Sequence, residues 1–168
     1  MCVNRRARIL LPEHRFKRPE SVLVVAYTIG GEFLLLRRRS PSAFWQSVTG
    51  SLRWGESPLQ AARRELYEET GIMAGSLLND LRHTERFSIV PPWRSRYSAN
   101  ARFNTEHWFS LLLPARRMPI LSANEHDDYV WLPAKRAQRK VSSWTNRAAI
   151  EVTAASLYAQ NFRKVISV

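Results

Sequence analysis

Three glutamates lie close together near the middle of the chain, at positions 65, 68 and 69. On a helix, residues three and four apart lie side by side, so Glu65, Glu68 and Glu69 would direct several carboxylate oxygens at one small volume. Such carboxylates repel each other unless cations lie among them. Oxygen ligands without a neighbouring His or Cys favour Mg²⁺ or Mn²⁺ over zinc. Arg64 can pair with a glutamate and hold the geometry, so the cluster predicts a divalent-metal site.

A longer pattern surrounds these glutamates. Between Gly50 and Ile72 the sequence GSLRWGESPLQAARRELYEETGI fits G-x5-E-x7-R-E-U-x-E-E-x-G-U, with U apolar, at every fixed position. Average residue usage gives a chance match of order one in a billion at any one start. A solvated helix face with ion pairs is the usual explanation for charged helical residues. The length of the pattern makes that alternative much weaker.

This pattern is the signature of the Nudix hydrolases, and the chain resembles that family at full motif strength. The resemblance implies an α/β fold, an α/β/α sandwich with a mixed sheet. It also implies hydrolysis of a nucleoside diphosphate linked to another group, with a divalent cation. By the same resemblance Glu65 and Glu69 ligate the metal, Glu68 is an accessory ligand or base, Arg64 orients them and Glu56 supports the site.

Four further segments resemble the branch of the Nudix family that acts on dihydroneopterin triphosphate. That resemblance implies cleavage to the monophosphate plus pyrophosphate in folate synthesis, with dATP and other deoxynucleoside triphosphates also accepted. The segments are KRP at 17–19, FWQSVTG at 44–50, RFNTEHWF at 102–109 and SWTNR at 143–147.

The same branch implies positions for the substrate. Lys17 and Arg38 would hold phosphates, and Glu125 would add a metal-ligating carboxylate from a loop. The remaining substrate-binding residues implied are Thr49 beside the metal helix, Phe87, Ser88, Ile89 and Val90 around the ring, and Asn146 on the last helix. Two alternatives stay open. Glu125 can equally be part of a solvated acidic turn, and the arginines at 37–39 can simply make a strand edge soluble, with only one or two of them facing a shared cleft.

The elements that must position these residues follow from local pattern. A helix is expected over Pro58–Thr70, with Ser57 as N-cap and Gly71 as its left-handed stop. Leu59, Ala62 and Leu66 should face the sheet. A second helix is expected from Trp144 to Tyr158 or beyond. Strands are expected at 21–28 and 32–37 as a hairpin, and at 44–49, 84–90, 106–113 and 129–132.

Length and composition fit one folded domain. The chain has 168 residues, of which 45% are apolar and 24% charged, which excludes collagen-like, disordered and low-complexity classes. We expect an irregular basic arm over residues 1–16 and a Nudix domain over 17–168. A single cysteine and the absence of a run of about 20 apolar residues predict a cytoplasmic protein outside the membrane.

The net charge of +12 indicates anionic partners. A small-molecule triphosphate is the expected partner, and the protein is expected to be a monomer or weak dimer. A hydrolase of modified nucleotides, an RNA 5′-pyrophosphohydrolase and a non-catalytic RNA-binding module are the alternatives. The basic stretch KRAQRK at 135–140 keeps nucleic-acid contact open as an alternative, but nucleic acid is not the expected partner. The intact glutamate set argues against the module without catalysis.

Overall fold

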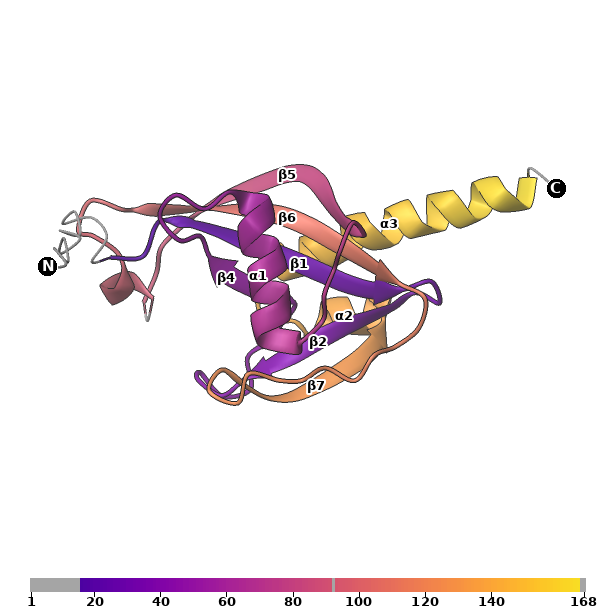
Figure 1. The fold of residues 1–168 in the computed structure, drawn as a ribbon, viewed down its shortest axis with the longest axis horizontal. Coiled ribbons are helices and arrows are strands. Elements are labelled where there is room, and N and C mark those ends of the chain that lie inside the picture. The colour runs from indigo at the N-terminus through magenta and orange to yellow at the C-terminus, as the bar shows by residue number, and fades with distance from the viewer. Residues whose placement is uncertain (1–15, 92, 167–168) are drawn as a thin grey trace, which may run out of the picture.

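A twisted mixed sheet forms the centre of the molecule (Figure 1). The computed structural model describes residues 16–91 and 93–166, with only the backbone described from 160 onward. The elements are β1 (Glu20–Thr28), β2 (Glu32–Arg38), β3 (Trp45–Gln46), β4 (Val48–Ser51), α1 (Pro58–Thr70), β5 (Leu78–Ser88), the short helix η2 (Arg94–Arg96), β6 (Phe103–Leu113), β7 (His126–Pro133), α2 (Ala134–Lys140) and α3 (Trp144–Ile166). The expected arm at 1–16 lies outside the described residues except for Phe16.

The seven strands pair mostly antiparallel, with one parallel pair. The strand order is β3-β2-β1-β6-β5, with β4 also on β1 and β7 on β2. Strands β1 and β6 run parallel, while β1 and β2 form the expected antiparallel hairpin. Along β1, the stretch from Ser21 to Val24 pairs with β4, and Tyr27 pairs with β2. The prediction of a mixed sheet is confirmed.

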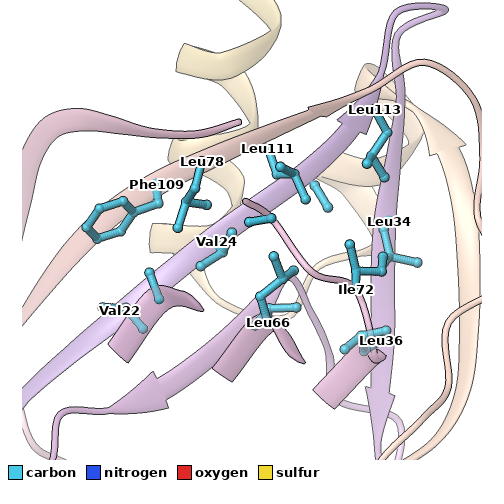
Figure 2. Packing of buried hydrophobic residues seen from close by; sticks show 14 of the residues in the cluster. Val22, Val24, Leu34, Leu36, Leu66, Ile72, Leu78, Phe109, Leu111 and Leu113 are labelled. Atoms are coloured by element: carbon cyan, nitrogen blue, oxygen red, sulfur yellow. The ribbon is translucent and has the colours of Figure 1, made fainter. Parts of the chain in front are cut away.

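Helices cover both faces of this sheet, which confirms the predicted α/β/α sandwich (Figure 1). Successive residues of a strand point to opposite faces. Val22 and Val24 of β1 accordingly pack toward α1, while Leu23 and Val25 pack toward α2 and α3. Figure 2 shows the α1 side, where Leu66 meets side chains from β1, β2 and β6. Because both faces are covered, β1 reads as a continuous apolar run.

Helix α1 begins and ends where the sequence predicts. The Ser57 hydroxyl accepts a hydrogen bond from the Gln60 N–H, the Gln60 side chain accepts one from the Ser57 N–H, and Gly71 closes the helix with φ of 68°. Such a reciprocal cap satisfies donors that the first turn leaves free. The expectation that Leu59 docks on the sheet is wrong, since this side chain is 38% exposed. It lies in the first turn, whereas the helix packs through Ala62, Leu66 and the turns that follow.

Several boundaries differ from the sequence expectation. Strand β5 begins at Leu78 rather than at 84, because an irregularity between Asp80 and Thr84, with Arg82 at φ of 52°, breaks the alternation that marks a strand. The stretch 135–140 lies in α2, which was not expected and which buries Ala134 and Ala137 against the sheet. None of the helices in the described part of the chain is long and apolar enough to cross a membrane.

Candidate functional site

One cavity, of about 330 Å³, gathers most of the predicted site residues. It receives side chains from α1, from the strands β1 and β6, from the 93–97 segment and from the start of α3. The predicted residues that line it are Lys17, Arg38, Thr49, Glu65, Glu68, Phe87, Glu125 and Asn146. Residues 88–90 are not among its lining. Strand alternation explains this for Ser88, which is exposed next to the half-buried Phe87, while Ile89 and Val90 lie beyond the end of β5.

Arg64 donates hydrogen bonds to three glutamates of the motif, Glu56, Glu65 and Glu68. Its guanidinium donates to both carboxylate oxygens of Glu56 at 2.8 Å and to Glu65 Oε1 at 2.6 Å. It also donates to Glu68 Oε2 at 3.0 Å and to the Ser51 carbonyl at 3.1 Å. The hydrogen bonds from Arg64 hold the pKa of Glu56 below its usual range. Arg64 therefore holds the carboxylates of Glu56, Glu65 and Glu68 together.

Gly50 gives Glu65 the space it occupies. A Cβ atom built on Gly50 would lie 1.8 Å from Cδ of Glu65, well inside any possible contact. The backbone of β4 therefore passes directly beneath the carboxylate, and only glycine permits this approach. Burial raises the pKa of Glu65, while the Arg64 contact opposes that shift. The first glycine of the motif is thus explained by the close packing of β4 against α1.

Glu69 is the most deeply buried member of the cluster, with 1% of its surface exposed. Its Oε2 lies 3.0 Å from Nε2 of His126, and its Oε1 has no partner among the described residues. Burial raises the pKa of Glu69 to about 7, against the lowering effect of His126. A buried carboxylate oxygen without a partner is costly, so this atom calls for a ligand.

His126 was missed by the sequence analysis, which expected no histidine near the glutamates. It begins β7, immediately after Glu125, and its Nδ1 lies 3.3 Å from the Arg37 carbonyl. Nothing in sequence spacing links it to Glu69, which is 57 positions away. The one sequence feature that could have pointed to His126 is its position next to Glu125. A histidine that holds a metal-ligating carboxylate in place is a common supporting arrangement.

The donor set fits a hard divalent cation. Ligand atoms of Glu69, Glu125 and His126 all lie within 4.8 Å of one another, and the unpartnered Oε1 of Glu69 offers an acidic oxygen at the same place. Since His126 already contacts Glu69, the free donors are carboxylate oxygens, with Glu65 and Glu125 along the cavity wall. Oxygen-rich sets of this kind suit Mg²⁺ or Mn²⁺.

Cations line the same cavity. Lys17 and Arg38, which the resemblance implies hold phosphates, both line it, and Arg96 of η2 joins them without any sequence expectation. The guanidinium groups of Arg38 and Arg96 lie over the ring of Trp93 at 5.3 and 5.0 Å. Burial, followed by the charge of Arg96, lowers the pKa of Lys17. The 93–97 segment thereby adds a cation and an aromatic ring to the cavity lining beside Lys17 and Arg38.

The three consecutive arginines at the end of β2 divide their roles. Arg37 pairs with Asp127 at 2.7 Å, and Arg39 donates to the Ala123 carbonyl at 2.7 Å. Arg38 alone of the three lines the cavity. This outcome confirms the expectation that only one or two of them face a shared cleft.

Two predicted substrate residues also have structural partners. The amide of Asn146 accepts from the Ser47 N–H at 2.6 Å and donates to the Ser143 hydroxyl at 2.8 Å. Thr49 accepts a hydrogen bond from the Gln46 side chain at 2.9 Å. These bonds tie the start of α3 to the β3–β4 connection. Both residues therefore shape the cavity wall.

The chain is similar to known proteins over most of its length. Residues 17–152 match the NUDIX domain. The chain is 45% identical over 140 residues to the dihydroneopterin triphosphate diphosphatase of Escherichia coli strain K12, covering 81% of this chain and 92% of that protein. It is 37% identical over 141 residues to the enzyme of the same name from Haemophilus influenzae, covering 82% of this chain and 88% of that protein.

A solved structure agrees with these sequence matches. The structure of the E. coli dihydroneopterin triphosphate pyrophosphohydrolase superimposes with a TM-score of 0.78 at 42% identity, covering 84% of this chain and 98% of that one. The motif on α1, the sandwich fold and these matches lead to one conclusion: this chain belongs to the Nudix family.

Proposed function

We propose that the protein hydrolyses dihydroneopterin triphosphate to the monophosphate and pyrophosphate. The observation that carries this proposal is the cavity itself, which is lined both by carboxylates suited to a divalent cation and by three cationic side chains. A triphosphate with its divalent cation matches this charge pattern. The identity to the two curated diphosphatases supports the choice of a pterin triphosphate. Deoxynucleoside triphosphates such as dATP present the same phosphates, so we expect them to be accepted as well.

In the proposed reaction, water adds to a phosphorus of the substrate and the bond to the outer two phosphates breaks. Lys17, Arg38 and Arg96 bind the phosphate oxygens and balance the charge that pyrophosphate carries as it leaves. Arg64 keeps Glu65 and Glu68 in fixed positions through its hydrogen bonds. No protein nucleophile is required. The protein's contribution is positioning and electrostatic stabilisation.

We propose Mg²⁺ as the cofactor, held by Glu65, Glu69 and Glu125, with Glu68 as an accessory group. When bound, the cation polarises phosphate oxygens and makes water a stronger nucleophile. Turnover should require added Mg²⁺, and Mn²⁺ should substitute. Full activity in excess EDTA would contradict the metal site.

We further propose that the enzyme works in the cytoplasm, because its single cysteine suits a reducing compartment.

Product analysis tests the proposed function directly. Dihydroneopterin triphosphate, the four deoxynucleoside triphosphates, oxidised dGTP and triphosphorylated RNA should be compared by kcat/KM, with products followed by phosphorus NMR. We expect the pterin triphosphate to be among the best substrates and pyrophosphate to be the first inorganic product. Early orthophosphate without pyrophosphate, or a strong preference for RNA or oxidised dGTP, would assign the protein to another Nudix activity.

Removing one phosphate-binding cation should weaken catalysis measurably. Arg38→Ala should lower kcat/KM for the triphosphate substrate about tenfold or more, because a charge-assisted hydrogen bond contributes roughly 1.5 to 3 kcal/mol. Lys17→Ala should have a similar effect. The matched control is Arg37→Ala, which removes the same charge from the neighbouring position but from a side chain paired with Asp127. Equal small losses in all three variants that vanish at high salt would indicate diffuse attraction by the net charge instead.

A further inference from the structure

The cavity contains a buried carboxylate that phosphate chemistry does not use. Glu106 projects from β6 on the sheet face covered by α3, lines the cavity and is 5% exposed. Its neighbour two positions on, Trp108, belongs to the core on the α3 side. A buried acid is unfavourable unless donors compensate it. Because a carboxylate repels phosphate, a triphosphate would direct a different part of the molecule toward Glu106.

The Glu106 carboxyl group accepts hydrogen bonds from two protein donors and can accept more. The Trp108 Nε1–H donates to its Oε1 at 3.1 Å, and the Thr145 hydroxyl also hydrogen-bonds the carboxyl. An ionised carboxylate can accept about four hydrogen bonds, so its capacity is only half used. Phe44 and Phe87, two of the aromatic side chains that line the same cavity, offer apolar surface for a flat ring. A flat ring that carries adjacent N–H donors would match both the carboxylate and the aromatic side chains beside it.

We infer that Glu106 is a specificity-determining residue that accepts paired N–H donors from the amino-oxo edge of the substrate's heterocycle. This inference rests on the proposed function and deepens it. A pterin presents a ring N–H beside an exocyclic amino group, and guanine presents the same pair. Adenine instead presents its amino group beside a ring nitrogen with a free lone pair, which would face a carboxylate oxygen. A bidentate pair of this kind discriminates by about tenfold to a hundredfold.

The protonation state of Glu106 adds a pH dependence to this selection. Burial raises the pKa of Glu106 to about 7, with a further contribution from Glu85 on the paired strand β5. Glu85 is itself in contact with His83 at 2.8 Å. The residues that face Glu106 from β1 and α3, Ser21 and Thr145, are uncharged.

Above its pKa, Glu106 is ionised and accepts both donors of the pterin or guanine edge. Below its pKa, the neutral acid can donate to the adenine ring nitrogen and accept from the adenine amino group. The preference for pterin or guanine over adenine should therefore increase as the pH rises through about 7. Groups at the metal site also titrate, but they act on every substrate alike. The ratio of kcat/KM values for two substrates on the same enzyme therefore cancels the effect of the metal-site groups.

The decisive variant is Glu106→Gln, because a glutamine amide donates through its nitrogen and accepts through its oxygen, which matches adenine. We expect the ratio of kcat/KM for dihydroneopterin triphosphate over dATP to fall by about tenfold to a hundredfold. The ratio for dGTP over dATP should fall as well. In the wild type both ratios should rise by about tenfold between about pH 6 and about pH 8, and in the variant both should be flat. Glu85→Gln, which changes a carboxylate outside the cavity lining, should leave the ratios near the wild-type values at pH 8.

The inference would be overturned if a folded Glu106→Gln variant kept the wild-type ratios of kcat/KM for dihydroneopterin triphosphate over dATP and for dGTP over dATP. If the variant does not fold, the wild-type pH series decides alone, and a flat ratio across that series overturns it. Failure to hydrolyse the pterin triphosphate while both nucleotides are hydrolysed would instead contradict the proposed substrate. In that case the ratio for dGTP over dATP still tests Glu106, so the two failures are distinguishable.

Discussion

Glu69→Gln should lower kcat by about a thousandfold while leaving the fold intact, because it removes a charge that the site needs for a divalent cation. The substitution keeps size and hydrogen-bonding capacity, and the Gln oxygen can still accept from His126 Nε2. What it loses is the negative charge on a buried carboxylate whose Oε1 has no hydrogen-bond partner among the described residues. Glu65→Gln should act in the same direction. Steady-state kinetics at saturating Mg²⁺, with circular dichroism and thermal melting, measure both expectations.

The matched control for these variants is Glu151→Gln. This glutamate lies on α3 with an exposed side chain, so its replacement changes the net charge equally without touching the cavity. We expect wild-type turnover from it. Wild-type rates in both Glu65→Gln and Glu69→Gln would show that the cluster is a structural ion-pair network and not a metal site.

Gly50→Ala should lower kcat by about a hundredfold, although the change adds a single methyl group. The new Cβ would lie 1.8 Å from Cδ of Glu65, so the carboxylate or the β4 backbone must move. A displacement of about 1 Å in a catalytic group can reduce the rate about a hundredfold. Because the displaced group is an acid that Arg64 holds in place, Mg²⁺ affinity should fall together with kcat. Kinetics over a range of Mg²⁺ concentrations separate the two effects.

Gly30→Ala is the control for this substitution. Gly30 lies in the β1–β2 turn, and a Cβ there meets only the Thr28 hydroxyl, at an ordinary 3.6 Å. We expect near-wild-type activity from that variant. If Gly50→Ala retained full activity and Mg²⁺ dependence, Glu65 would have enough freedom to move aside, and the close packing of β4 on α1 would not determine the site.

Local sequence determined helix α1, which carries the three glutamates. Ser57, Pro58 and Gly71 set its two ends, because capping and a left-handed stop depend only on residues within one turn. The spacing of Glu65, Glu68 and Glu69 then followed from helical geometry. Strands β1 and β2 were equally clear, since β-branched and leucine-rich runs on either side of Gly30 and Gly31 predict a hairpin from adjacent residues alone.

Tertiary structure decided which groups meet this helix. The contact of His126 with Glu69 joins residues 57 positions apart, and it depends on the pairing of β7 with β2, which no local pattern records. Arg96 and Trp93 reach the cavity from an irregular segment for the same reason. Of the three arginines at the end of β2, the tertiary structure brings only Arg38 into the cavity lining. Local propensity acts over a few residues, whereas strand pairing and packing bring together side chains that are distant in sequence, so the sequence defined the carboxylates and the fold defined their surroundings.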